Sequence, residues 1–189
     1  MKYFTKHSDL PILDLYNEYM RLVNCNTIQW NSTNQICINA IPGKTNDIYY
    51  GSGSLYYDWQ KSTKNKKGEI LNLPIREVPL EENQFTEVSD AFKGTLFEDI
   101  LFRLQDKFNL GRVRLMKSKP KTCLSWHWDD STRLHYPLKT HKGCIMVIEN
   151  EVMHIPKHEW WATNTLKNHT AFNGSMEERI HLVAAILND

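Results

Sequence analysis

The chain has 189 residues, of which 41% are hydrophobic and 24% are charged. These are the proportions of an ordinary globular protein, and the length is enough to bury a substantial core within one domain, which we expect to span residues 1–189. The formal net charge of +1 gives the chain no overall attraction to nucleic acid or to an anionic membrane, so we expect neither as a partner.

Cysteine spacing and the N-terminal sequence bear on the cellular setting. The four cysteines, Cys25, Cys37, Cys123 and Cys144, form no Cys-x-x-Cys pair, which argues against a zinc ribbon or a redox motif and favours reduced thiols. The first residues lack the apolar stretch of a signal peptide, and the sequence contains no run of about eighteen apolar residues. We therefore expect a cytoplasmic protein without a membrane span.

The start of the chain predicts a helix and then a short strand. Ser8 or Asp9 can cap the helix, with Pro11 tolerated in its opening turn. The apolar residues that recur in it at helical spacing are Ile12, Tyr16, Met20 and Val23. Residues 35–41 predict a strand, because they are mostly apolar and a Pro-Gly turn follows them.

The middle of the chain predicts a strand, a long loop and a second helix. We expect a strand at residues 55–59, with aromatic side chains that could face a substrate. Residues 61–94 are rich in loop signals, with a possible element only at residues 69–73, and a loop of this length often serves as a lid or a binding loop. The second helix begins at Thr95, and Gly111 is placed to end it.

From residue 110 the sequence consists of short runs of strand-forming residues separated by turn residues. These runs are 112–116, 123–129, 133–138, 144–149, 151–155, 158–164 and 179–187. Several short strands at such spacing predict an all-β sandwich or barrel. We expect residues 110–189 to form this β core, and residues 1–109 to supply mostly buttressing helices, a strand and the possible lid.

Four tryptophans lie in the β-rich half: Trp126, Trp128, Trp160 and Trp161. Adjacent side chains on a strand face opposite ways, so at most alternate tryptophans can line one pocket. Packing in the core is the commoner role of tryptophan, and we expect it here rather than a platform on which bases stack.

The segment Trp126-His127-Trp128-Asp129-Asp130 carries the clearest chemical signal. Side chains alternate along a strand, so His127 and Asp129 share one face and Asp130 lies on the other. One histidine from a distant strand would complete two imidazoles and one carboxylate, a set that binds Fe(II) and leaves positions open for substrate and oxygen. A histidine held by an aspartate for structural reasons is the commoner origin of such a pair.

Four histidines are candidates for the distal ligand. His169 follows a polar turn at the point where the strand pattern resumes, which favours it. His154 and His158 lie near a proline in a predicted hairpin turn, where exposure is expected. His181 shares a strand face with Arg179 and could point into the barrel.

Arg179 is a candidate anchor for the far carboxylate of an oxo-acid cosubstrate. It opens the apolar run 180–187, so at least its stem is expected to be buried, and a buried guanidinium needs an anionic partner. No internal carboxylate is evident for it, and a guanidinium holds a carboxylate in two-point geometry. Arg133 and His135 alternate on one face of the strand beside the metal-binding segment.

Five motifs appear in order between residues 110 and 189. They are His127-Trp128-Asp129, Arg133-Leu134-His135, Gly143-Cys144, Asn168-His169-Thr170 and Arg179-Ile180-His181-Leu182-Val183. As an ordered set they resemble the iron(II)/2-oxoglutarate-dependent oxygenases, in the aspartyl/asparaginyl β-hydroxylase-like family that includes the proline cis-hydroxylases. The resemblance implies a mainly β fold with flanking α-helices, a cupin-like double-stranded β-helix or jelly roll.

The resemblance also implies an activity, that of a dioxygenase. Such an enzyme hydroxylates an unactivated C–H bond of an amino acid, free or within a peptide or protein, using O2 and 2-oxoglutarate and releasing succinate and CO2. The residues implied to hold Fe(II) are His127, Asp129 and His169. Arg179 would pair with the C5 carboxylate of 2-oxoglutarate and His135 would contact the cosubstrate, while Arg133 would contact either the cosubstrate or a substrate carboxylate.

Two positions depart from the family pattern. In the animal peptidyl β-hydroxylases the metal-binding carboxylate position is non-ligating, whereas Asp129 restores the complete triad and is more similar to the free-amino-acid hydroxylases. Many oxygenases of the wider superfamily have a serine or threonine where this chain has His181. The alternative is a cupin-type metal-binding protein, such as an isomerase, sensor or scaffold, which uses the same histidines and has no need of Arg179.

Overall fold

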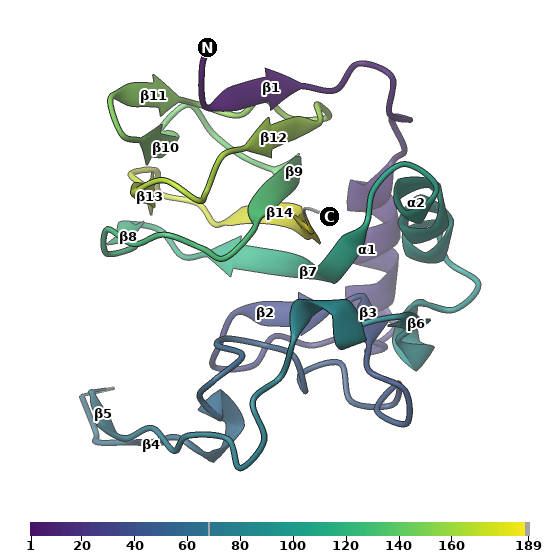
Figure 1. The fold of residues 1–189 in the computed structure, drawn as a ribbon, viewed down its shortest axis with the longest axis vertical. Coiled ribbons are helices and arrows are strands. Elements are labelled where there is room, and N and C mark those ends of the chain that lie inside the picture. Colours follow the sequence, from purple (N-terminus) through teal and green to yellow (C-terminus); the bar gives the residue numbers. More distant parts are fainter. Residues whose placement is uncertain (68, 188–189) are drawn as a thin grey trace.

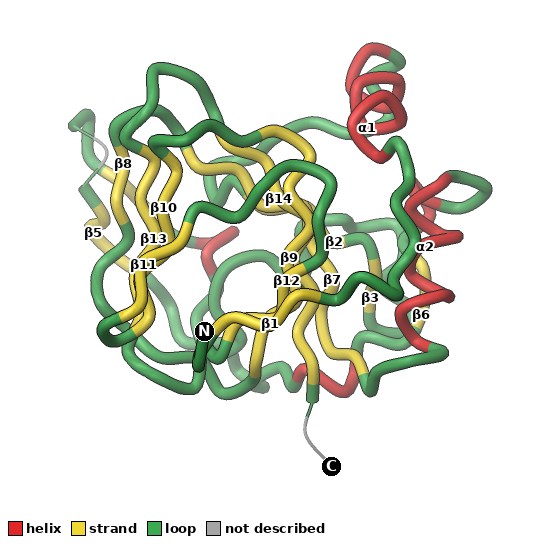
Figure 2. Tube along the Cα trace, turned by 90° about the horizontal axis from the view of Figure 1, so that it is seen from above, coloured by secondary structure: helices red, strands yellow, loops and turns green. Residues whose placement is uncertain are grey.

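The computed structural model describes residues 1–67 and 69–187. A six-stranded and a four-stranded antiparallel sheet face one another, and two α-helices cover the outer side of the larger sheet (Figures 1 and 2). Figure 2 shows the three layers most clearly, with the smaller sheet, the larger sheet and the helices following one another across the molecule. This is the mainly β, jelly-roll architecture with flanking helices that the sequence predicts.

The larger sheet has the strand order β1-β12-β9-β14-β7-β2. Its strands are β1 (Phe4–Lys6), β2 (Gln35–Cys37), β7 (Leu110–Ser118), β9 (Thr132–Lys139), β12 (Trp161–Thr163) and β14 (Arg179–Ile186). The smaller sheet has the order β11-β10-β13-β8. Its strands are β8 (Thr122–Cys123), β10 (Cys144–Ile148), β11 (Glu151–Met153) and β13 (His169–Asn173). Two short pairs complete the sheets: β3 (Asn39–Ala40) with β6 (Glu87–Val88), and β4 (Thr63–Lys64) with β5 (Ile70–Asn72).

The two faces of the larger sheet have different roles, and β14 shows this most clearly. Its side chains at Ile180, Leu182 and Ala184 belong to the main core, which the helices cover. The alternate side chains at Arg179 and His181 line a cavity between the two sheets. The period of two along a strand therefore separates residues that stabilise the fold from residues that face the interior site.

Helix α1 (Leu15–Asn24) begins later than the sequence predicts. Its cap is Asp14, whose carboxylate accepts a hydrogen bond from the Asn17 backbone N–H at 3.2 Å, so the prediction of a cap at Ser8 or Asp9 was wrong. The predicted apolar face was also displaced: Ile12 is 69% exposed. The buried positions are Leu15, Tyr19 and Leu22. Several sets of apolar residues fit a period of 3.6 in this segment. The cap at Asp14 fixes where the helix begins, and with it the set that is buried.

Helix α2 (Leu96–Gln105) begins as the sequence predicts. The Thr95 hydroxyl accepts a hydrogen bond from the Phe97 backbone N–H at 3.2 Å. The prediction that Gly111 ends this helix was wrong, because Gly111 lies within β7. A Cβ at this glycine would stand 2.7 Å from the Cβ of Glu82. The close packing of Glu82 against the backbone here is therefore possible only because residue 111 has no side chain.

Several predicted strands are shorter or absent. The strand expected at residues 35–41 is divided into β2 and β3. Residues 55–59 form no strand; they make one isolated bridge, between Tyr57 and Ile75, and end in the 3₁₀ turn η1 (Trp59–Lys61). Residues 69–73 contain β5, as expected. β12 starts only at Trp161, because His158 has a φ of 61° and interrupts the extended backbone. Two further 3₁₀ turns are η2 (Glu82–Gln84) and η3 (Asp90–Phe92).

The helices of the structure are short. Within residues 1–67 and 69–187, none is long and apolar enough to cross a membrane.

Candidate active site

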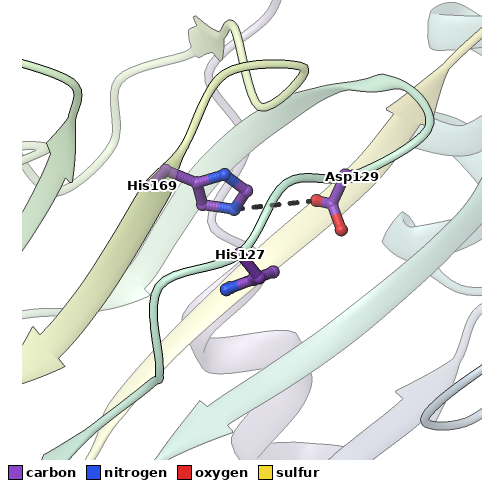
Figure 3. A group of neighbouring side chains, drawn as sticks. All are labelled: His127, Asp129 and His169. Carbon is purple, nitrogen blue, oxygen red and sulfur yellow. Dashed lines mark ion pairs between the residues drawn. The ribbon is translucent and has the colours of Figure 1, made fainter.

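Three side chains from two distant segments meet at one end of the space between the sheets (Figure 3). His127 and Asp129 lie between β8 and β9, and His169 opens β13. The potential ligand atoms of the three residues all lie within 4.8 Å of one another. Asp129 Oδ2 lies 3.8 Å from His169 Nε2. The structure therefore brings together the three residues that the sequence proposes as a metal site.

The segment 124–129 is held against β13 without being a regular strand. The predicted strand at residues 123–129 is reduced to the last residue of β8 and an isolated bridge between His127 and His169. In that bridge the His127 N–H donates to the His169 carbonyl at 3.1 Å, and the His169 N–H donates back at 2.8 Å. Backbone pairing thus places the two imidazoles side by side, with ring centroids 4.2 Å apart.

Both imidazoles are oriented by backbone carbonyls. The Nδ1 atom of His127 lies 2.8 Å from the Ser125 carbonyl oxygen, and the Nδ1 atom of His169 lies 3.0 Å from the Lys167 carbonyl oxygen. A carbonyl can only accept, so each Nδ1 carries the proton and each Nε2 keeps its lone pair. A hydrogen bond from the far nitrogen is the usual support of a metal-binding histidine.

The competing residues lie elsewhere. Asp130 is exposed and its carboxylate is outside the cluster, whereas Asp129 is inside it. The Nδ1 atom of His154 is 2.9 Å from the Cys144 carbonyl oxygen, and His158 packs on Tyr136. Both are half-buried, so the prediction that they are exposed was wrong.

A cavity of about 510 Å³ extends from the cluster into the space between the sheets. Its lining includes Arg133, His135, Arg179 and His181 from the larger sheet and Met146 and Ala171 from the smaller one. The larger sheet thus contributes the basic groups, together with the apolar Met116 and Val183, while the smaller sheet adds Met146 and Ala171 beside His169. A concave cavity with a few converging polar groups is the usual form of a small-molecule site.

Arg179 is the most informative residue of the cavity. Its Nε is buried and has no hydrogen-bond partner among the described residues. Burial lowers the pKa of its guanidinium, although arginine remains charged near neutral pH. A buried positive charge without a protein partner is costly, so this position is suited to an anion supplied from solution.

Comparison with known proteins assigns the chain to a family. The model of the aspartyl/asparaginyl β-hydroxylases matches residues 58–188. The chain belongs to this family. The resemblance inferred from the sequence is thereby confirmed. No curated protein sequence matches the chain.

Solved structures resemble this family member only distantly. A 2OG-Fe(II) oxygenase family oxidoreductase from Burkholderia pseudomallei aligns with a TM-score of 0.44 and 15% identity, over 53% of this chain and 59% of its own. A viral collagen prolyl hydroxylase from Paramecium bursaria Chlorella virus-1 gives 0.39 and 13%, over 50% and 75%. A cupin domain from Bordetella pertussis gives 0.35 and 15%, over 41% and 81%.

In this member of the hydroxylase family, His135 and His181 form a buried pair in the wall of the cavity. Their Nδ1 atoms are 3.4 Å apart, and both Nε2 atoms are buried without a partner in the described part of the chain. Burial and the charge of Arg179 lower the pKa of His135 to about 3 and that of His181 well below its ordinary value. Both rings are neutral at pH 7. One proton lies between the two Nδ1 atoms, so the pair presents one Nε2–H donor and one Nε2 acceptor to the cavity.

The buried His135 makes the fold sensitive to acid. Its pKa is about 3 in the folded protein and its ordinary value is 6.5. Between these values the unfolded chain binds a proton that the folded chain does not, so stability falls as pH falls through this window. We expect the free energy of unfolding to drop by about 2 kcal/mol between pH 7 and pH 5 because of this residue alone. Urea unfolding of His135→Gln at pH 7 and pH 5 should show a loss of unfolding free energy smaller by this amount. A loss as large as that of the wild type would contradict the role of His135.

Arg133 is already engaged by protein groups. Its Nε donates to Asp129 Oδ2 at 3.1 Å, its Nη1 contacts the Ser131 hydroxyl, and its Nη2 lies 3.5 Å from Glu82 Oε1. Its guanidinium therefore supports the proposed carboxylate ligand, in addition to lying along the cavity wall. Whether it also reaches a cosubstrate or a substrate carboxylate stays a prediction.

Three groups near the cavity were missed by the sequence reasoning: Arg112, Arg114 and Glu82. Arg114 is buried, donates to the Gln35 side-chain oxygen at 2.9 Å and has its pKa lowered to about 9 by burial and by Arg112. Arg112 and Arg114 are two residues apart on one strand, so their side chains share a face. Two charges on one face of an otherwise apolar strand are a signal for a binding site that the sequence offers. Glu82 had no such signal, because it lies in the loop-rich region 61–94.

The tryptophans divide between core and surface. Trp160 is buried, at 1% exposure, as expected for core packing. Trp126 and Trp128 are 57% and 69% exposed, so the same expectation was wrong for them. They stand on either side of His127, whose own side chain points inward. Trp128 lies at the edge of the cavity.

Proposed function

We propose that this protein is a Fe(II)/2-oxoglutarate-dependent dioxygenase that hydroxylates an unactivated C–H bond of an amino acid, free or within a peptide or protein. One observation carries the proposal: the two-histidine, one-carboxylate cluster shares a cavity with the guanidinium of Arg179, whose buried Nε has no partner among the described residues. A metal-binding cupin would use the cluster but has no need of that guanidinium. Arg179 therefore favours the oxygenase over this alternative.

The side chains present suit the proposed metal. His127, Asp129 and His169 would hold Fe(II), since two imidazole nitrogens and one carboxylate are the ligand set of non-haem Fe(II) oxygenases and leave coordination positions open. Both Nε2 atoms keep a lone pair for the metal because the Nδ1 atoms are engaged by carbonyls. When bound, iron with 2-oxoglutarate and O2 supplies the oxidising power for hydroxylation, and succinate and CO2 are the co-products.

The protein's own groups would bind and orient the cosubstrate. Arg179 would pair with the C5 carboxylate of 2-oxoglutarate through charge-assisted hydrogen bonds. His135 would contact the cosubstrate by donating from Nε2, in which case its Nδ1 accepts the proton of His181. Arg133 would contact the cosubstrate or a substrate carboxylate while holding Asp129. The apolar side chains of the smaller sheet would limit the entry of water.

Product analysis tests the proposal. Purified protein incubated aerobically with Fe(II), 2-oxoglutarate and a panel of free amino acids and peptides is expected to form succinate and a product heavier by about 16 mass units, one inserted oxygen atom. Omission of 2-oxoglutarate should remove both. If no panel member gives succinate, and 2-oxoglutarate gives no thermal shift in the presence of Mn(II), the cupin-type alternative is favoured.

A further inference from the structure

A buried carboxylate outside the ligand set lies behind the site. We propose that Glu82 is a positioning residue that acts through Arg133 to hold the Asp129 carboxylate in place and to strengthen the binding of a divalent cation. The inference rests on the proposed function, because the cation is the iron proposed above. It assigns a role to the region before residue 110, which contributes none of the three proposed ligands.

The contacts form a continuous path. Glu82 Oε1 lies 3.5 Å from Arg133 Nη2, and Arg133 Nε donates to Asp129 Oδ2 at 3.1 Å. The Glu82 and Arg133 side chains are 10% and 8% exposed, so little water competes for these contacts. Asp129 Oδ2 is also the oxygen that lies 3.8 Å from His169 Nε2. The path from Glu82 therefore ends on an oxygen at the cluster itself.

Glu82 is held firmly and is ionised. Burial alone would raise the pKa of its carboxyl group, but the charge and hydrogen bonds of Arg112, with Arg114 and Arg133, lower that pKa to about 2. Arg112 donates to Glu82 from its backbone N–H at 2.7 Å, from Nε at 3.1 Å and from Nη2 at 3.0 Å. The lack of a side chain at Gly111 leaves the space that Glu82 occupies.

The negative charge of Glu82 matters because Arg133 and a cation share one carboxylate. An uncompensated guanidinium at Asp129 would draw the carboxylate toward itself and repel the cation, and both effects are strong where water is excluded. Glu82 offsets the charge of Arg133 while leaving its Nε free to orient Asp129. Groups that orient metal ligands in this way commonly change metal affinity by about 10- to 100-fold.

Glu82 also has a structural role, which the test must separate. Its partner Arg112 donates from Nη1 to the carbonyl oxygens of Gly51 and Gly53, at 2.7 and 2.9 Å, and so ties down that loop. Arg112→Met removes this anchor and the Arg112–Glu82 ion pair but leaves Glu82 facing Arg133. Glu82→Gln removes the charge that faces Arg133. A role confined to stability would make the two variants equivalent.

Calorimetric titration of Mn(II) into the full chain, without cosubstrate or oxygen, provides the test. We expect Glu82→Gln to bind Mn(II) at least about tenfold more weakly than the wild type. Arg112→Met should lose clearly less affinity than Glu82→Gln, because the backbone N–H of residue 112 still holds the Glu82 carboxylate, while its melting temperature falls. Glu81→Gln changes the charge equally at an exposed neighbour and should change neither quantity. If Arg112→Met does not fold, Arg112→Lys replaces it.

Two results would overturn the inference: wild-type Mn(II) affinity in Glu82→Gln, or an equal loss of affinity in both the Glu82 and the Arg112 variants. Absence of Mn(II) binding by the wild type would remove the metal site and this inference together. Mn(II) binding without 2-oxoglutarate binding would instead count against the oxygenase and leave the role of Glu82 standing.

Discussion

His127→Ala is expected to lose 2-oxoglutarate turnover down to the level of the metal-free protein. The substitution removes one of the three groups that converge at the cluster. Loss of a group that merely orients a ligand costs about 10- to 100-fold in metal affinity, so loss of a ligand itself should cost more. Succinate formation with Fe(II), measured against a sample without protein, provides the readout.

His154→Ala is the matched control for that experiment. His154 was a competing candidate for the distal ligand, and it is not among the three residues whose ligand atoms converge in the structure. Turnover should therefore persist in this variant. Succinate production that survives in His127→Ala would remove the basis for the proposed metal site.

Arg179→Met is expected to weaken 2-oxoglutarate binding by about 100-fold. A charge-assisted, two-point contact to a carboxylate contributes about 2 to 3 kcal/mol, and each 1.4 kcal/mol corresponds to about a factor of ten. Arg179→Lys keeps the charge but loses the planar guanidinium group. Its affinity for 2-oxoglutarate should therefore lie between those of the wild type and Arg179→Met. Calorimetric titration of 2-oxoglutarate into the Mn(II)-loaded variants under anaerobic conditions measures both.

Although Arg179→Met should weaken 2-oxoglutarate binding, it should not destabilise the ligand-free protein. Arg179 is half-buried, its buried Nε has no partner among the residues described, and methionine of similar length removes that charge from the cavity wall. We expect the melting temperature of ligand-free Arg179→Met to rise or stay level. A fall in melting temperature together with unchanged 2-oxoglutarate affinity would show that Arg179 supports the fold and not the cosubstrate.

Local patterns predicted much of the candidate site. The alternation of side chains along a strand placed Arg179 and His181 on one face of β14, and it favoured Asp129 over Asp130 although their segment is not a regular strand. The choice of His169 depended on the change from a polar turn to a strand pattern. The structure brings His127, Asp129 and His169 together, and each of these inferences depends on residues that are neighbours in the chain.

Features that depend on long-range contacts were not predictable in the same way. Glu82 reaches the site only because the loop region folds against β7 beside Gly111. The start of α1 was misplaced because several apolar sets satisfy the helical period. Trp126 and Trp128 are exposed because the chain between β8 and β9 lies at the open edge of the smaller sheet, which is a property of the assembled sheets.

Anaerobic titration of 2-oxoglutarate into the wild-type protein, with and without Mn(II), tests the central claim most directly. That claim is that a metal cluster and Arg179 face one cosubstrate in one cavity. One equivalent of 2-oxoglutarate should bind when Mn(II) is present, and binding should be much weaker when it is absent. Equal binding in the two titrations, or none in either, would contradict it.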